Sequence, residues 1–595
     1  MRAGPERRLR PRLRRRPGDH DRHGPGRLRG RLAPGAGQPQ RGARRGSSTP
    51  GRGRGEHGQP DRRPGARQRG RGRRGGDPDR SRGQREDHRR GDCCRARNDQ
   101  LRGDLRDLAA RAPRLPPRRA RRGARGLSGY PLALARSELA GEEVWLVGGA
   151  VRDDLLGRTP AEEALDIDLV VAGDPARAAE ALRRAGGPGV AAFQLSDRFG
   201  GWRVSGSGWQ VDCIPLQGES LEADLQARDL TVNAIARPLA GGGEIDPTGG
   251  LVDVAERRLR MVSPEAFDRD PLRVLRLARL GSLLGMEADP PTVAAAREAA
   301  PGLGAVAGER LFTELSLILS SSAPGEGLTA AAELGAEAAV LPELHELRGI
   351  EQTRYHHLDA HGHTLQVVDE VAALEIDPRA AAGERSGEVA EVLAEPLADN
   401  LTRGEALRWA ALLHDIAKSR TRVVSDEGRV GFPGHDREGA WMAREILGRL
   451  RASERLSSYV AAITGTHLLL GFLVHRQPLD AGDRFDYLEA CDPVGVDVTF
   501  LSVADRLATR GRKADEAIAA HLEVALPMMG AALDWRREGR PRSPIPGDEL
   551  ARELGIEPGP RLGEILAGIE RAVYTGEVES SDQAVEMARE LLAAG

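Results

Sequence analysis

Asp166 and Asp168 are the residues whose types and spacing point most directly to chemistry. They lie two positions apart in the apolar run at residues 165–171, which is typical of a buried strand. Side chains two apart in a strand share a face, so both carboxylates point one way while Ile167 and its apolar neighbours point into a core. Adjacent carboxylates repel unless cations lie between them, and Mg²⁺ prefers such oxygen ligands. The pattern predicts a metal site suited to phosphoryl or nucleotidyl transfer.

The elements that must hold this site come just before it. Residues 144–147 predict a short buried strand, Gly148 and Gly149 end it, and the following VRDDLL predicts a helix. A glycine turn at a helix N-terminus presents backbone N–H groups that bind phosphate. The alternative is a surface strand with two solvated aspartates, which D-x-D alone does not exclude. Together the two features favour a site for a nucleoside triphosphate and metal.

The whole stretch resembles the signature of the class II nucleotidyltransferases, which are the tRNA CCA-adding enzymes and bacterial poly(A) polymerases. That signature is LVGG-x-VRD-x-LLG followed by D-x-D. The resemblance implies that the head binds the nucleotide through part of this signature. The matching residues are Gly148, Gly149, Val151, Arg152, Asp153, Leu155, Leu156, Gly157, Asp166 and Asp168, and those implied to bind nucleotide are Gly148, Gly149, Arg152 and Asp153.

The resemblance also implies a third metal ligand. In the wider superfamily a carboxylate from a neighbouring strand often completes the metal site, and Asp212 fits that place. It lies in the second of two strands that the sequence predicts around glycine turns in residues 193–216. The alternative is an ordinary aspartate at a strand end. Within the same stretch Arg198 and Gly200 match the family's flexible loop.

A second motif, LQARDLTVNAIA at residues 225–236, resembles R-R-D-F-T-x-N-A of the family. By resemblance, Arg228, Asp229 and Asn233 contact the sugar and phosphates of the nucleotide. An arginine fork suits phosphate, and an asparagine amide can bond a ribose hydroxyl. The alternative is a polar helix start capped by Asp229 or Thr231.

In FDRDPLRVLRLARLGSLLG, Asp270, Arg273 and Arg276 recur at helical spacing and are predicted to share one face. The stretch resembles the family motif E-D-x-x-R-x-x-R, whose Asp and first Arg read the incoming base. Cytosine and adenine both carry an exocyclic amino group that Asp can bind, which implies selection of CTP and ATP without a template. Arg269 departs from the family's Glu, and a solvated ion-paired helix face is the alternative. Residues 308–319 resemble the supporting helix of the last motif.

A further set of polar motifs begins at His356. The strings YHHLDAHGHTLQVV, RWAALLHDIAKSRTR, GFPGHDREGA and LSVADRLATRG together resemble an HD domain, with its His-Asp pair expected in the middle of an apolar helix. The resemblance implies a divalent metal of unidentified kind and hydrolysis of phosphomonoesters or cyclic phosphodiesters, such as damaged tRNA 3′ ends. Histidines bonded in a core, or a degenerate RNA-binding domain, are the alternatives. The predicted ligands are His363, His414, Asp415 and Asp505, with His435 and His467 as candidates for phosphate or a second metal.

The composition sets broader limits. The 595 residues can form three or four domains, and the formal net charge of -1 conceals an arginine-rich start, so it does not argue against an RNA partner. Lysine occurs only at Lys418 and Lys513, which suggests a GC-rich genome. The four cysteines show no metal-ligand spacing and fit a reducing cytoplasm. No apolar run approaches the roughly 18 residues of a membrane span.

The expected architecture is an α/β nucleotidyltransferase head with a small mixed sheet, followed by all-helical neck, HD and tail domains. An arginine-, glycine- and proline-rich start cannot bury enough apolar surface to fold, and it is predicted to be disordered or a mis-assigned start. Residues 372–400 are expected to form an insertion with a mobile loop. The predicted boundaries are 1–126 for the disordered segment, 127–255 for the head, 256–345 for the neck with the base-recognition helix, 346–535 for the HD domain and 536–595 for the helical RNA-binding tail.

The function that this reading predicts is addition of CCA to tRNA 3′ ends from CTP and ATP with Mg²⁺, in the cytoplasm, with an HD phosphohydrolase for end repair. The nearest alternatives are a poly(A) polymerase and an enzyme that adds only CC or only A. An HD phosphohydrolase with an RNA-binding head is disfavoured by the intact D-x-D. A noncatalytic RNA-binding protein would depend only on the arginine-rich start. The sequence leaves the oligomeric state open.

Overall fold

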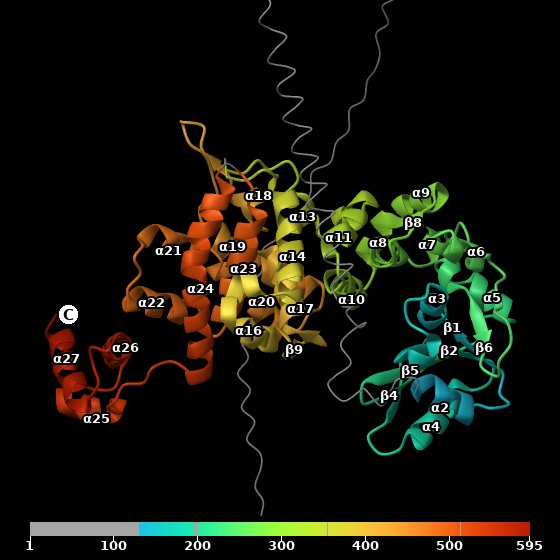
Figure 1. Ribbon diagram of the computed structural model, residues 1–595, viewed down its shortest axis with the longest axis horizontal. Coiled ribbons are helices and arrows are strands. Elements are labelled where there is room, and N and C mark those ends of the chain that lie inside the picture. Colours follow the sequence, from blue (N-terminus) through green and yellow to red (C-terminus); the bar gives the residue numbers. More distant parts are fainter. Residues whose placement is uncertain (1–129, 196–199, 354, 512, 595) are drawn as a thin grey trace, which may run out of the picture. The chain divides into compact units, whose positions relative to one another are not determined.

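The computed structural model describes residues 130–195, 200–353, 355–511 and 513–594 (Figure 1). The predicted disorder of residues 1–126 and the loop match at Arg198 lie outside the described residues. The described chain begins with a mixed sheet and its helices and continues almost entirely as helices. The predicted fold class is therefore confirmed.

One six-stranded sheet organises the head, in the order β3-β4-β5-β2-β1-β6. Strands β2 and β5 pair in parallel, and their other neighbours pair antiparallel. Residues 193–216 were predicted to hold two strands, but three run through them because an edge strand with mostly exposed residues gives little apolar alternation. The strands are β1 Val144–Val147, β2 Asp166–Val171, β3 Ala191–Gln194, β4 Trp202–Gly206, β5 Trp209–Pro215 and β6 Ala236–Pro238.

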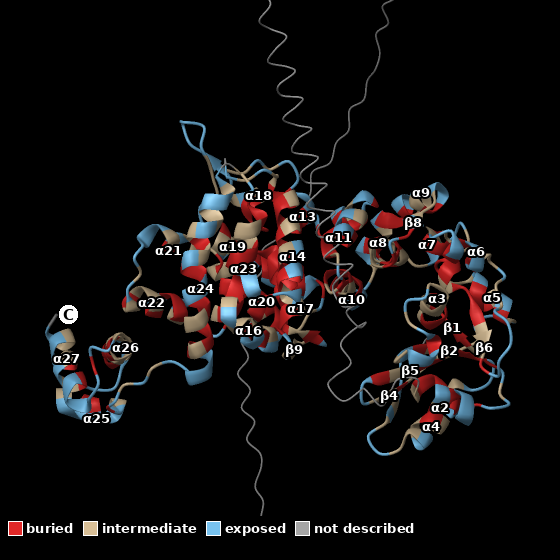
Figure 2. Ribbon diagram, viewed as in Figure 1, coloured by how far each residue is buried: buried red, intermediate tan, exposed pale blue. Residues whose placement is uncertain are grey.

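The head strands and helices enclose buried residues, drawn in red in Figure 2. Ile167, Leu169 and Val211 from the strands and Leu182 from α4 belong to one buried core. A second cluster joins Val147 and Val170 to α5. Helix α4 begins where the side chain of Asp174 accepts a hydrogen bond from the backbone N–H of residue 176. The helices are α2 Tyr130–Glu138, α3 Gly149–Leu155, α4 Pro175–Gly186, α5 Leu221–Gln226 and α6 Gly250–Ala255, with the short 3-10 helices η2 Ala161–Glu163 and η3 Thr231–Asn233.

In the neck, the prediction that Asp270 shares a helical face with Arg273 and Arg276 is wrong. Helix α8 begins at Arg273, and Asp270 is extended with φ −153° because it precedes Pro271, which disfavours helical backbone. Residues 308–319 form one helix, as the motif implied. The neck elements are β7 Arg258–Leu259, α7 Ala266–Arg269, α8 Arg273–Leu284, β8 Glu287–Ala288, α9 Pro290–Ala299, η4 Ala300–Ala305, α10 Gly308–Leu319, α11 Pro324–Glu333, α12 Ala336–Val340 and α13 Pro342–His345.

The HD region is a helical bundle in which the His-Asp pair lies at a helix end, not in mid-helix as predicted. Helix α17 ends at Leu413 and His414 is its C-cap. The apolar run hid this end because Ile416 and Ala417, in the turn, are also fully buried. The elements are α14 Ala360–Ile376, α15 Arg379–Ala382, η5 Gly383–Arg385, α16 Ser386–Leu393, β9 Pro396–Ala398, β10 Leu401–Thr402, α17 Arg403–Leu413, α18 Lys418–Thr421, β11 Val423–Val424, β12 Val430–Gly431, α19 His435–Arg449, α20 Glu454–Thr466, α21 Leu469–Leu473, η6 Val474–Arg476, α22 Ala481–Cys491, α23 Gly495–Ala508 and α24 Ala514–Glu538.

The expectation of a mobile loop at residues 372–400 is also wrong. The segment contains α15, α16 and β9, and Ala381, Val389 and Leu393 belong to the main core. The many charged residues of this segment lie on the outward faces of short helices. Because they outnumber the buried apolar residues, the sequence suggested a loop.

The tail has a core of its own. Helices α25 Gly547–Leu554, α26 Pro560–Thr575 and α27 Ser581–Ala594 share a separate buried cluster. Gly555 ends α25 with φ 65° and leads into the turn before α26. Helix α26 buries Leu562, Ile565 and Ile569 along one side.

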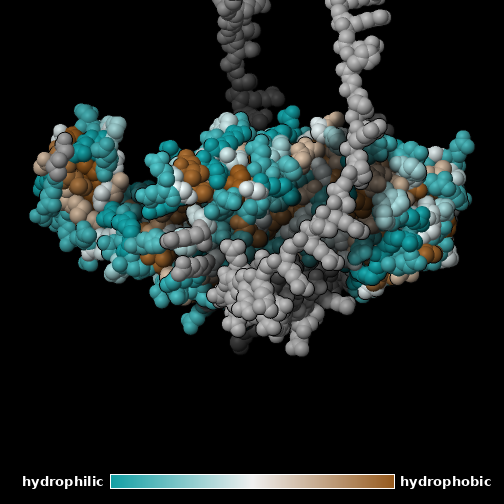
Figure 3. All heavy atoms as spheres, turned by 90° about the horizontal axis from the view of Figure 1, so that it is seen from above, coloured by the Kyte–Doolittle hydropathy of each residue, from teal (hydrophilic) through white to brown (hydrophobic). Residues whose placement is uncertain are grey.

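Two helical stretches of the HD region are long and apolar enough to cross a membrane by length and composition alone, a test that buried core helices also pass. They are Glu454–Arg476 and Ala514–Glu538, and both contribute residues to the main core. The face seen in Figure 3 is mostly hydrophilic, with small separate apolar patches.

Candidate active sites

The three predicted head carboxylates come together on two neighbouring strands. Asp166 and Asp168 lie on one face of β2, while Ile167 and Leu169 are buried on the other. In the parallel pairing of β2 with β5, Asp168 and Asp212 are direct Cα partners. Cross-strand partners place their side chains side by side on one face of a sheet. The sheet register thus assembles the cluster, which we call the carboxylate triad: Asp166, Asp168 and Asp212.

Asp168, at the centre of the carboxylate triad, has a raised pKa. Burial, followed by the charges of Asp166 and Asp212, raises the pKa of Asp168 to about 6. Gly148, with φ 72°, lies so close that a Cβ on it would be 3.0 Å from Oδ2 of Asp168. Only glycine therefore fits here. Clustered hard oxygens beside a glycine turn fit Mg²⁺ by their donor chemistry.

Arg203, which the sequence analysis did not single out, binds the triad directly. It is the Cα partner of Asp212 on β4, and its Nε and Nη2 donate to Oδ1 and Oδ2 of Asp212 at 2.7 and 2.6 Å. In the sequence, only the alternation of the strand indicated on which face Arg203 lies. The pairing of β4 with β5 must be known before this face can be related to Asp212.

The predicted phosphate ligand Arg152 is fixed from two sides. Its Nε donates to Oδ1 of Asp153 at 2.9 Å, and its Nη1 donates to Oδ1 of Asn233 at 2.7 Å. A Cβ on Gly149 would lie 3.6 Å from its Nη2. The first and second motifs are thus joined through this guanidinium, and Asp153 and Asn233 orient it.

Arg228 faces the same glycine turn. Its Nη1 would lie 3.8 Å from a Cβ on Gly148, while its Nε is 3.2 Å from Oδ2 of Asp224. The Arg228 charge also lowers the pKa of Asp168 against the larger effect of burial. A second guanidinium therefore lies beside the triad.

A chain of polar contacts continues from Asn233 into the neck. Its Nδ2 donates to Oδ1 of Asp229 at 3.1 Å, and Nη1 of Arg276 donates to Oδ2 of Asp229 at 3.1 Å. Burial alone would raise the pKa of Asp229, but Arg276 and the hydrogen bonds hold it at about 2. Buried Glu314 on α10 receives both Arg276 and Arg279. Asp229 and Arg276 thus form a structural link rather than two free ligands.

The predicted base-reading arginine, Arg273, is anchored on backbone. Its Nη1 donates to the carbonyls of Arg228 and Ala266 at 3.0 Å each, and its Nη2 donates to the carbonyl of Ala227 at 2.9 Å. These bonds use three of the five guanidinium N–H groups, so two are left for another partner. The anchor fixes Arg273 against the second motif.

Asp270 is held by a different partner. Nη2 of Arg310, from α10, donates to its Oδ2 at 2.7 Å. Arg269, where the family has Glu, turns to Glu265 with a 3.9 Å separation and is half exposed. Asp270 and Arg273, the acceptor and donor expected to read the base, are therefore positioned by different partners. Arg310 contacts Asp270, whereas Arg269 does not.

In the HD region, Asp415 lies within one buried cluster with all the predicted ligands. Its Oδ2 is 3.1 Å from Nε2 of His414 and 3.9 Å from Nε2 of His363. His363 Nε2 is also 2.9 Å from Oδ1 of Asp505. These side chains converge although His363 comes from α14, His414 and Asp415 follow the last residue of α17, and Asp505 comes from α23.

The other oxygen of Asp415 faces the two additional histidines. Its Oδ1 is 3.3 Å from Nε2 of His435 and 3.8 Å from Nε2 of His467. Lys418, one of the chain's two lysines, lies 2.6 Å from Oδ2 and donates to Oε1 of Gln352 at 2.7 Å. One oxygen of Asp415 thus faces His363 and His414, and the other faces His435 and His467.

The protonation of these histidines fits metal ligands. Nδ1 of His414, His435 and His467 each faces the backbone carbonyl three residues earlier, at 2.8, 2.7 and 2.6 Å. A carbonyl can only accept, so Nδ1 carries a proton, and Nε2 has a free lone pair whenever the ring is neutral. Against the effect of burial, the charge of Asp415 raises the pKa of His414, so this ring would give up its second proton on binding a metal. Burial lowers the pKa of His467 to about 4, which keeps its ring neutral.

Three of the buried ring nitrogens make no hydrogen bond of good geometry among the described residues, although a carboxylate oxygen lies 2.9, 3.1 or 3.3 Å from each: Nε2 of His363, His414 and His435. Ring nitrogens and carboxylates held together in a buried site fit divalent metal ions, and imidazole with carboxylate suits several transition metals. Two groups offer compact ligand sets, namely His363, His414 and Asp505, and Asp415, His435 and His467. These residues would suit one ion in each group, and Asp415 of the second group also faces His414 of the first.

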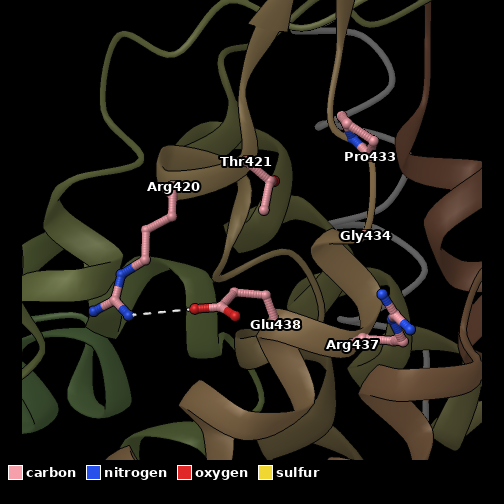
Figure 4. Close-up of a pocket in the computed structure, with 6 residues that line it drawn as sticks. All are labelled: Arg420, Thr421, Pro433, Gly434, Arg437 and Glu438. Atoms are coloured by element: carbon pink, nitrogen blue, oxygen red, sulfur yellow. Dashed lines mark ion pairs between the residues drawn. The ribbon is translucent and has the colours of Figure 1, made fainter.

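A surface pocket of about 540 Å³ lies between α18 and the start of α19 (Figure 4). Arg420 is 3.6 Å from Glu438, and Arg437 lines the same pocket. Gly434, also in its lining, directly precedes His435. Two guanidinium groups at this place suit an anionic substrate.

Comparisons with known proteins match three separate parts of the chain to known families. The family described as Poly A polymerase head domain matches residues 144–260. The family described as probable RNA and SrmB-binding site of polymerase A matches residues 285–348, and the HD domain family matches residues 383–510.

Similar proteins carry related names. The A-adding tRNA nucleotidyltransferase of Deinococcus radiodurans is 36% identical over 448 residues, covering 74% of this chain and 93% of that protein. The CC-adding tRNA nucleotidyltransferase of Thermus thermophilus is 34% identical over 454 residues, covering 74% and 92%. The multifunctional CCA protein of Halorhodospira halophila is 32% identical over 380 residues, covering 58% and 79%.

Solved structures agree on the fold. The Bacillus stearothermophilus CCA-adding enzyme in complex with CTP aligns with a TM-score of 0.52 and 24% identity, covering 78% of this chain and 98% of that one. At this identity the likeness shows the fold alone, whereas the relatives above, at more than 30% identity over most of their length, show the family. The chain therefore belongs to the class II family of CCA-adding enzymes and bacterial poly(A) polymerases, and it is a tRNA nucleotidyltransferase with an HD domain.

Proposed function

We propose that the chain completes tRNA 3′ ends by adding C, C and A in turn from CTP and ATP. The observation that carries the proposal is the carboxylate triad, whose central residue Asp168 pairs in register with Asp212 beside the glycine turn at Gly148. The names of the relatives, which include A-adding, CC-adding and multifunctional CCA proteins, supply the substrate class.

The triad would hold Mg²⁺. When bound, such ions lower the pKa of the attacking hydroxyl and stabilise the leaving oxygen. The chain's own part is binding and orientation. Arg152, held by Asp153 and Asn233, and Arg228 would hold the triphosphate, and Gly148 leaves space for it next to Asp168.

Selection of the base would fall to Asp270 and Arg273. The carboxylate of Asp270 keeps lone pairs beyond those used by Arg310, and two N–H groups of Arg273 remain after its three backbone bonds. An acceptor and a donor side by side suit the amino group and ring nitrogen of cytosine or adenine. Uracil and guanine would leave Asp270 facing another acceptor.

Partial addition is the second candidate, and the relatives favour it. The A-adding and CC-adding proteins each align over 74% of this chain, while the multifunctional protein aligns over 58%. Addition of A, of CC and of CCA all need the same triad, so the carboxylates do not show which of the three this chain performs.

Incorporation on tRNA lacking CCA, supplied with CTP, ATP or both, tests this proposal. Addition of C, C and A followed by a stop supports it. Addition of two C residues that no ATP extends, or of A only to tRNA ending in CC, establishes a partial enzyme. A long tail from ATP alone would make the chain a poly(A) polymerase, and no incorporation would reject nucleotide addition altogether.

For the HD region we propose a phosphohydrolase that repairs tRNA 3′ ends, in which the two ligand groups around Asp415 would hold divalent ions. Ions held there would activate water for attack on a phosphoester. The supporting observation is the set of buried Nε2 atoms of His363, His414 and His435, each with a carboxylate oxygen close by. The expected result is release of phosphate from tRNA ending in a 3′ phosphate, or opening of the ring in tRNA ending in a cyclic phosphate, by the wild type but not by Asp415→Asn. Equal release or ring opening by both proteins would reject the assignment.

A further inference from the structure

The carboxylate triad already contains an internal cation. Arg203 makes two short bonds to Asp212, at 2.7 and 2.6 Å, and the side chain of Asp212 is only 11% exposed. Paired, bidentate bonds between a guanidinium and a carboxylate are the strong form of this interaction. The pKa of Arg203 is raised first by its bond to Asp212, and also by the charges of Asp166 and Asp168. Arg203 is thus coupled to all three carboxylates.

A metal ion and Arg203 compete for the same charge. Two like charges a few ångströms apart repel each other, and a divalent ion feels twice the repulsion of a monovalent one. The bidentate bond also occupies one lone pair on each oxygen of Asp212. A free metal ion entering the triad must therefore displace Arg203 or bind close to its positive charge.

We propose that Arg203 stands in for the metal in the nucleotide-free triad, holding Asp212 until a nucleotide–metal complex displaces it. The triad would then bind free divalent ions weakly and take up metal mainly together with the triphosphate, whose negative charge offsets the repulsion. This inference rests on the proposed function, because it takes the triad as the metal site of nucleotide addition.

The opposite arrangement is a positioning arginine that aims Asp212 at the metal. Residues that orient metal ligands strengthen binding, and their loss typically weakens metal affinity about 10–100-fold. Replacing Arg203 should therefore tighten metal binding if it stands in for the metal, and weaken metal binding if it orients Asp212. Damage to the fold would also weaken binding, so tighter binding in a variant cannot arise from misfolding.

The test measures Mn²⁺ binding to the full chain without nucleotide, by electron paramagnetic resonance of the free ion. All proteins carry Asp415→Asn, so that the HD cluster contributes little. Arg203→Gln is expected to tighten binding by about tenfold, since one repelling charge is removed, while Arg203→Lys keeps the charge and stays within about threefold of the parent. With CTP added, the difference between Arg203→Gln and the parent should shrink.

Two controls separate the possible failures. Arg183→Gln removes an arginine that forms the same two-bond pair with Glu180 on α4, at 2.7 Å for each bond, outside the triad, and it should change nothing. Asp168→Asn should abolish the binding that Arg203→Gln tightens; if it does not, the metal site of the proposed function is wrong. If Asp168→Asn abolishes binding but Arg203→Gln leaves it unchanged or weaker, only the stand-in role is overturned.

Discussion

Gly148 lies against Asp168 so closely that a single added carbon would touch the carboxylate. The Cβ of an alanine would be 3.0 Å from Oδ2 of Asp168, and the backbone has φ 72° and ψ −135°, which L side chains rarely adopt. The glycine turn therefore sets the position of the central carboxylate as well as the space beside it. This relationship gives the first prediction.

Gly148→Ala should lower kcat for nucleotide incorporation at least about tenfold, because small displacements of reacting groups are costly. The matched control is Gly187→Ala. Gly187 has a similar backbone, φ 79° and ψ −162°, but nothing lies within 4 Å of its Cβ position. Steady-state rates with thermal unfolding of both variants separate the effects. Equal loss of rate in both would mean that backbone strain, not contact with Asp168, is responsible.

The pH dependence of metal binding should follow Asp168. Burial, and then Asp166 and Asp212, raises its pKa to about 6, so the proton competes with metal below that pH. Affinity for Mn²⁺ in the head should be constant above about pH 6 and fall about tenfold for each pH unit below it. Titrations from pH 5 to 8, in protein carrying Asp415→Asn, measure this. An affinity that does not change between pH 5 and 7 would contradict the prediction.

Arg310 should matter for nucleotide selection although it is half exposed. Its bond to Asp270 at 2.7 Å fixes the acceptor that reads the base, so Arg310→Ala should raise KM for CTP and ATP and reduce their preference over UTP and GTP by about tenfold. Arg310→Lys should restore part of the preference. Arg269→Ala is the control, because Arg269 only meets exposed Glu265 at 3.9 Å. A larger effect of Arg269→Ala than of Arg310→Ala would contradict this division of roles.

The HD cluster should lose its ions in steps. His435 contacts only the Oδ1 side of Asp415, so His435→Ala should remove one tightly bound ion and Asp415→Asn both. Metal analysis of the purified full chain after dialysis gives the stoichiometry. His475→Ala is a control, since this histidine lies on η6 outside both ligand groups. One ion in the wild type and one in His435→Ala would show that the second group binds no metal.

Sequence reasoning could predict those parts of the site that depend on local periodicity. Alternation alone places Asp166 and Asp168 on one face of β2. The resemblance to the family supplied Asp212. Its position beside Asp168 depends on the pairing of β2 with β5, two strands that are far apart in the sequence. Arg203 was missed because its contact exists only through the β4–β5 register. Arg310 was matched to a motif, but nothing local indicated that it meets Asp270.

Element ends were harder to predict than elements. Pro271 sets the start of α8, yet the three-residue spacing of the polar positions suggested an unbroken helix through Asp270. Likewise the buried turn after Leu413 carries the same apolar residues as a helix, so the sequence did not show that α17 stops at His414. At Asp270 the proline that follows decides the backbone, whereas at the end of α17 the burial of the turn gives it the same apolar pattern as a helix.

We assign nucleotide addition to the carboxylate triad and not to the HD cluster. The most direct measurement compares Asp168→Asn and Asp415→Asn on one tRNA lacking CCA, following incorporation from CTP and ATP. Asp168→Asn should reduce incorporation by at least about a hundredfold, because charge stabilisation in the transition state is lost, while Asp415→Asn should retain it. If incorporation survives in Asp168→Asn, or is lost in Asp415→Asn with the fold intact, the assignment of the two sites is wrong.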